Sequence, residues 1–349
     1  MPLVLVLGLC VLPFTAAPQN HEPADSARAT AAFAAEWRGL HRQLIGLEQA
    51  HGVFYGALVK QRGSVDEAEV FRRMQQRIAD GATATANPEA ERGFAALGPQ
   101  AAAIIRRTHE LHREVLSIFA SVEPSARPGA IDAALERYLS RPDASLPDQP
   151  KDMSILYDHP YTSFVDDPVK PRREIRYPRP TGLVWASHWF QLAIFEPFEQ
   201  PAEAAERRRR VEVVTERLQR KLSPGRLPDG FPAELPLAPS IAPGLLSIHE
   251  RAAAIFDNLN VMNEVMAEVL VHPRVDDVRA AIREVVELFT DRRYRVADPG
   301  DWVTMALRHS IFAQGGPALG VMRESDRNSS GHFQHTRRGG RAMPPGGVR

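Results

Sequence analysis

Apolar residues recur at steps of three and four through most of this chain, which is the spacing of one face of an α-helix. Between residues 29 and 60 one such stripe is formed by Phe33, Trp37, Leu40, Leu44, Leu47, Phe54 and Leu58. The alternating pattern typical of strands is scarce. We therefore expect an all-α fold, a multi-helix antiparallel bundle in which two packed helical halves are joined by a long irregular segment.

Helix boundaries divide the chain into these parts. The periodicity predicts helices at 29–60, 64–80, 88–122 with a break at Gly98 and Pro99, 130–140, 183–195, 201–222, 243–271, 275–289 and 301–313. Ser64 to Glu67 fits a capping box, and Asn87 before Pro88 fits an N-cap. The N-terminal helical half is thus 29–140 and the C-terminal half 183–322. Residues 141–182 are rich in Pro and Asp and are expected to be irregular.

The chain begins with an apolar run at residues 3–14. Twelve residues are too few to cross a bilayer, which takes about 20, but they match the core of a signal peptide. We expect a signal peptide at 1–17, a flexible linker at 18–28, and an exported protein, periplasmic or secreted, with no stable membrane span after cleavage. The alternative is a misassigned start codon, which would leave the protein cytoplasmic.

Charge and cysteine content exclude several classes of function. Lys+Arg and Asp+Glu both number 43, so no net field attracts nucleic acid. Cys10, the single cysteine, lies inside the predicted signal peptide. The cleaved chain would therefore have neither disulfides nor cysteine-ligated zinc. The last segment, 323–349, has six Arg against two acidic residues and no core-forming pattern, which predicts a disordered basic tail.

Histidines fall on the apolar lines of several predicted helices, where an imidazole must be hydrogen-bonded or bound to something. The candidates are Glu48 and His51, spaced as in carboxylate-bridged metal bundles; His109 and His112, three residues apart on one helix; His188 between two tryptophans; and His249, on a line with Leu245, Ala252 and Phe256. If these lines face a common interior, the side chains converge.

The first hypothesis is a transition-metal site for iron, manganese or zinc, with ligands from His109, His112, Glu48, His51, His249 and His188. Such a site would suit an oxidoreductase. Haem held by two axial histidines is a further option, although no Cys-x-x-Cys-His motif is present. Phosphate-binding loops, His-Glu-x-x-His and Gly-x-Ser-x-Gly motifs are also missing from the sequence, so no catalytic residue is assigned.

The second hypothesis is an exported binding or scaffold protein without a cofactor. In this interpretation the histidines are hydrogen-bonded core residues. The aromatic helix 183–195 and the segment 141–182 would form a contact surface for another protein or for a small hydrophobic ligand.

Overall fold

The computed structural model describes residues 23–61, 65–82, 86–151, 180–223, 236–272, 275–293, 299–310 and 318–319. Every regular element in these ranges is a helix, so the all-α prediction is confirmed. The predicted signal peptide (1–17), the basic tail (323–349) and most of the irregular segment lie outside the described residues. No helix in the described ranges is both long and apolar enough to cross a membrane.

The helices follow one another along the chain with short connections. They are α1 (Pro23–Glu36), α2 (Arg38–Gln61), α3 (Glu67–Asp80), α4 (Pro88–Ala96), α5 (Pro99–Ser121), α6 (Arg127–Leu139), α8 (Pro180–Ala193), α9 (Glu196–Glu199), α10 (Ala204–Lys221), α11 (Ala238–Ile241), α12 (Pro243–Ile248), α13 (Glu250–Val271), α14 (Val278–Thr290) and α15 (Pro299–Ser310), with 3₁₀ turns at Pro124–Ala126 and Pro142–Ala144.

Local capping chemistry sets several of these boundaries. The side chain of Asn87 accepts hydrogen bonds from the backbone N–H groups of Glu89 and Ala90, which confirms the predicted N-cap of α4. The capping box predicted from Ser64 is wrong by two residues. Asp66 is the N-cap of α3 and accepts from the N–H of Glu69.

Two helices predicted as continuous are each divided in the structure. The 29–60 helix is α1 and α2, with a turn at Trp37 across which the backbone bonds Trp37 N–H to Phe33 and His41 N–H to Trp37 continue. The 243–271 helix is α12 and α13, divided at His249, where the extended backbone interrupts the helical dihedrals. The apolar stripe continues through both breaks, so periodicity alone does not reveal them.

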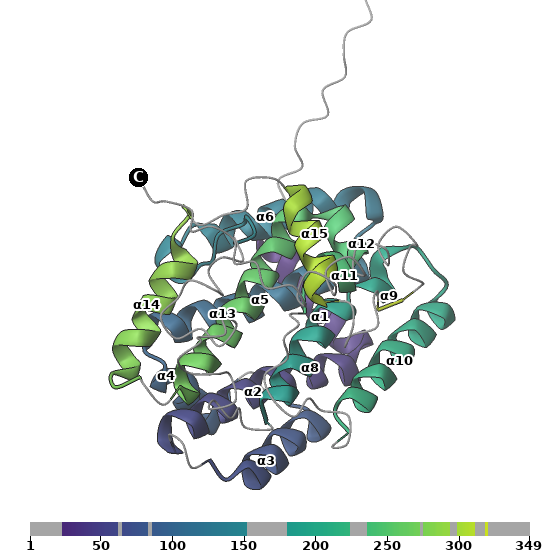
Figure 1. Cartoon of the computed structure of the whole chain (residues 1–349). Coiled ribbons are helices and arrows are strands. Elements are labelled where there is room, and N and C mark those ends of the chain that lie inside the picture. Colours follow the sequence, from purple (N-terminus) through teal and green to yellow (C-terminus); the bar gives the residue numbers. More distant parts are fainter. Residues whose placement is uncertain are drawn as a thin grey trace, which may run out of the picture.

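Helix α13 runs through the middle of the molecule, with α2, α5, α8 and α14 packed on it (Figure 1). The two predicted halves therefore meet along this helix. Figure 1 places α3, α10 and α14 on the outside, where each buries only one face; in α10 that face is Val211, Val214 and Leu218. Residues Ala252 to Leu270 of α13 are all buried, polar side chains included. This polar content of the central helix brings the candidate site together.

Helices α2 and α4 approach until their backbones touch. A Cβ added to Gly93 would lie 1.7 Å from the backbone oxygen of Gly52, and one added to Gly52 would lie 2.5 Å from the backbone oxygen of Ala90. Only glycine allows this crossing, because the obstructing atoms are main chain and cannot rotate away. The crossing positions α2, which carries His51.

We expect Gly93→Ala to lower the free energy of unfolding by roughly 3 kcal/mol or more, because the added methyl group must push the two helices apart. Gly39→Ala, in α2 with no atom near the added Cβ, should instead raise it by up to about 1 kcal/mol. Urea unfolding followed by circular dichroism measures both. Equal stability of the two variants would contradict the backbone contact.

A buried carboxyl group joins α9 to α12. Glu196 accepts a hydrogen bond of 2.9 Å from the N–H of Gly244, near the N-terminus of α12. Burial raises the pKa of Glu196 from 4.5 to about 8, despite the backbone N–H groups of Gly244 and Leu245 that favour the charged form. Because the folded pKa lies above the unfolded one, this group costs stability as the pH rises from about 4.5 towards 8.

Replacing Glu196 by Gln keeps an oxygen acceptor for Gly244 and removes the ionisation. The unfolding free energy of E196Q should therefore exceed that of the wild type by an amount that grows between pH 5 and pH 8, at about 1.4 kcal/mol per unit of pKa difference. Urea unfolding at several pH values measures this gap. E216Q, on the exposed side of α10, should follow the wild type; a gap for E196Q that stays constant with pH would refute the assignment.

Candidate metal centre in the helical core

Two imidazole rings meet face to face in the middle of the molecule. His51 comes from α2 and His188 from α8, and their Nε2 atoms are 2.9 Å apart, with the ring centroids separated by 4.9 Å. Both side chains are buried, at 1% and 0% exposure. Burial lowers the pKa of each to about 3, with the charge of His188 adding to the effect on His51. Both rings are therefore neutral at physiological pH.

The outer nitrogen of each ring has its own partner. His51 Nδ1 lies 2.8 Å from the backbone oxygen of Leu47, one turn earlier in α2, and His188 Nδ1 lies 3.2 Å from Oε1 of Glu264 in α13. A carbonyl oxygen only accepts, so His51 Nδ1 carries the proton and donates it. The Nε2 atom of the neutral His51 ring is consequently a lone pair directed at His188.

His188 Nε2 cannot satisfy both of its nitrogen neighbours, because Asn263 Nδ2, a donor, also lies 3.3 Å away. If Nε2 is unprotonated, it accepts from Asn263 but its lone pair faces that of His51. If Nε2 carries the proton, it donates to His51 but its N–H faces the N–H of Asn263. Burial and the charge of Glu268 raise the pKa of Glu264 well above its usual range, which favours the second state. Either state leaves one unfavourable contact.

A third histidine lies beside this pair. The ring of His109, from α5, has its centroid 5.8 Å from that of His51. Its Nε2 atom is buried without a hydrogen-bond partner. Burial, followed by the charges of nearby His51, Arg113 and other histidines, lowers the pKa of His109 well below its ordinary value. His109 is therefore a neutral ring with an unused buried nitrogen next to the pair.

The remaining predicted residues of the N-terminal half lie beside this group with other partners. His112 donates from Nε2 to the backbone oxygen of Gln191 at 2.7 Å, while its Nδ1 atom is buried without a partner. Glu48 forms a buried ion pair with Arg113, and burial raises the pKa of Glu48 to about 6, offset by the Arg113 charge. Glu48 is thus committed to a guanidinium group rather than to a histidine.

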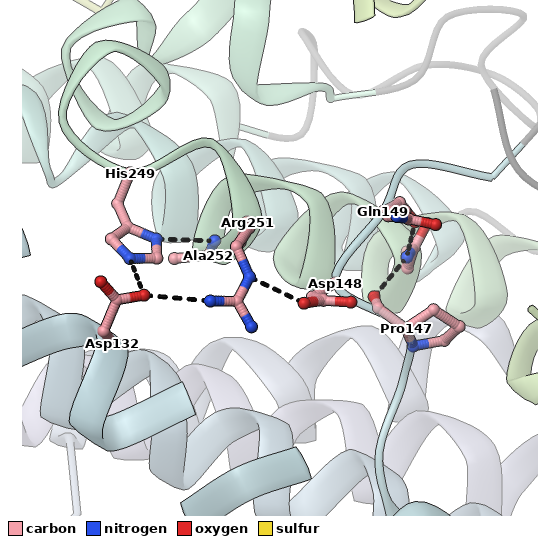
Figure 2. Close-up of polar contacts among 8 residues, drawn as sticks. Asp132, Pro147, Asp148, Gln149, His249, Arg251 and Ala252 are labelled. Atoms are coloured by element: carbon pink, nitrogen blue, oxygen red, sulfur yellow. Dashed lines mark hydrogen bonds and ion pairs between the residues drawn. The ribbon is translucent and has the colours of Figure 1, made fainter. Parts of the chain in front are cut away.

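His249 stands apart from the other histidines. Its Nδ1 atom caps α13 by accepting from the N–H of Ala252 at 3.2 Å, and its Nε2 atom donates to Oδ1 of Asp132 (Figure 2). Arg251 links the same Asp132 to Asp148. Fifteen helical residues separate His249 from Glu264, which is ~22 Å along the axis. The structure therefore does not bring His249 to the centre.

Sequence reasoning missed three side chains at the centre. Glu264 and Asn263 both contact His188, and the hydroxyl group of Tyr55, one turn beyond His51, donates to the backbone oxygen of Asn263 at 3.3 Å. Glu264 Oε2 and Asn263 Oδ1 are buried without hydrogen-bond partners. The signal for them was the polar content of a helix that is otherwise apolar all round.

Within the described residues, no three His, Cys, Asp or Glu side chains are already arranged to hold a metal ion. The centre is a pair of nitrogens in direct contact, with a third histidine close by. Comparisons of the chain with protein families, curated proteins and solved structures found no match. Its chemistry must therefore be argued from the geometry alone.

The contacts of His249 predict a structural role. His249→Ala should lower the free energy of unfolding by about 1 kcal/mol, since the cap of α13 is lost, while His249→Asn should stay close to the wild type because asparagine is a good N-cap. Urea unfolding of the three proteins tests this. If the alanine variant is as stable as the wild type, His249 does not cap α13.

Proposed function

We propose that this protein binds a divalent transition metal ion in its helical core, through the Nε2 atoms of His51 and His188, with His109 as the third ligand. The observation that carries the proposal is the contact between the two Nε2 atoms, buried and in neutral rings. A cation between two lone pairs removes the conflict that neither proton arrangement resolves. Neutral imidazole suits iron, manganese and zinc alike.

The spacing of the two nitrogens favours an ion with right-angled ligands. Bonds of about 2.1 Å that meet at 90° hold two nitrogens ~3.0 Å apart, while the tetrahedral angle holds them ~3.4 Å apart. The distance of 2.9 Å between His51 and His188 agrees with the right-angled arrangement. This supports Fe²⁺ or Mn²⁺ over a tetrahedral Zn²⁺ site.

The outer partners of the rings support the same proposal. Histidines that bind metals commonly donate their second ring proton to a backbone carbonyl or a carboxylate, which orients the ring and fixes its tautomer. Leu47 supplies a carbonyl for His51, and Glu264 supplies a carboxylate for His188. His109 adds a buried nitrogen that has no other partner. A small shift of its ring would complete a three-nitrogen site.

A network without a metal is the competing arrangement. If the Asn263 amide is turned by 180°, its oxygen can accept from a protonated His188 Nε2, and the conflict disappears. The scaffold hypothesis would then stand, although every residue of its proposed contact helix, α8, is buried in the described structure. Metal content distinguishes the two arrangements.

Metal-free protein exposed anaerobically to Fe²⁺, Mn²⁺ or Zn²⁺ and then desalted should retain about one ion per chain, with His51→Gln and His188→Gln each retaining under roughly a third. Mass spectrometry of the elements measures the content, and circular dichroism verifies the fold of each variant. Bound ion should also raise the unfolding free energy, by about 2.7 kcal/mol at a hundredfold excess over Kd.

His249→Asn is the matched control, since it alters a buried histidine ~22 Å from the centre and should retain as much metal as the wild type. Folded wild-type protein that keeps less than about a tenth of an ion per chain with all three metals would refute the proposal. Equal retention by the wild type and both glutamine variants would place the ion elsewhere.

A further inference from the structure

We infer that the metal centre keeps one coordination position for a small external ligand, and that Asn263 binds this ligand. The inference rests on the proposed function. It goes further because it makes the centre an open site of the kind that performs chemistry, rather than a closed structural one.

The argument starts from the hydrogen bonds of Asn263. Its Nδ2 group has one described contact, the lone pair of His188 Nε2 at 3.3 Å, and its Oδ1 atom has none although it is buried. An ion bound to Nε2 takes over that lone pair. The amide of Asn263, a residue that is 0% exposed, would then have donors and an acceptor without partners. Leaving buried polar groups unpaired is costly.

The position of the amide says where a new partner must lie. Nδ2 is in contact with Nε2, so it stands beside any ion that binds there. A ligand on the adjacent coordination position is within hydrogen-bonding distance of the amide and can replace the lost contact. Because Nδ2 donates and Oδ1 accepts, the ligand must be a small molecule or anion with oxygen or nitrogen acceptors, such as water, hydroxide or a peroxide.

Burial limits the size of this ligand. His51, His109, His188 and Asn263 are all at most 3% exposed, and α8 and α13 are buried along most of their length. Large substrates have no room beside the ion. The hydroxyl group of Tyr55, bonded to the backbone oxygen of Asn263, adds a second polar group near this position. The ligand class is therefore a molecule of two or three heavy atoms.

Azide is a suitable probe, being small, anionic and an acceptor of hydrogen bonds. Protein loaded with Co²⁺ should show a visible spectrum that changes saturably as azide is added. Asn263→Leu should bind azide at least tenfold more weakly, about the effect of one lost hydrogen bond, with its Co²⁺ content unchanged. Asn263→Asp, which keeps the shape but cannot donate, should show the same loss should the leucine variant fail to fold.

Asn260→Leu is the control, because Asn260 lies on the same helix, is equally buried, and donates to the backbone oxygen of Pro236 instead. It should bind azide like the wild type. Co²⁺-loaded wild type whose spectrum does not respond to azide, or an Asn263 variant that binds azide as tightly as the wild type, would overturn the inference. Wild type that takes up no Co²⁺ would instead refute the metal site itself.

Discussion

The contact between His51 and His188 is the constraint around which the rest of the core is arranged. Two neutral rings from different halves of the chain meet at 2.9 Å in an interior without solvent. Holding them there requires α2 and α8 to be positioned closely, and the glycine crossing of α2 with α4 contributes to this. Polar groups buried at this depth stabilise a fold only if they are paired. The arrangement is therefore understandable when something satisfies the nitrogens.

Much of the fold could be predicted because periodicity and caps are local signals. The helical class, the Asn87 cap and the break at Gly98 and Pro99 all follow from neighbouring residues. The division at His249 could not be predicted in this way, since the apolar line continues through it and histidine is an unusual N-cap. What ends the helix there is a tertiary contact, the hydrogen bond to Asp132 from another helix.

The candidate site was predicted in part for the same reason. A histidine on an apolar line is visible in the sequence, so His51, His109 and His188 could be named, but their convergence depends on how helices cross. Glu48 was assigned as a ligand from its spacing to His51. Its partner is instead Arg113, 65 residues away and adjacent to His112. Spacing within one helix cannot reveal such a competitor, because an ion pair between helices is decided by packing.

A polar helix at the centre of an apolar bundle connects stability with function. Apolar side chains at Asn263 and Glu264 would bury as much surface without any unsatisfied atoms, so packing alone does not explain these two residues. Their unused oxygens point to a guest that supplies what the protein lacks, and a cation with its own small ligand supplies both charge and hydrogen bonds. Binding such a guest to the folded chain alone would make its affinity part of the folding free energy. The same groups that make the empty core costly would then make the occupied core stable.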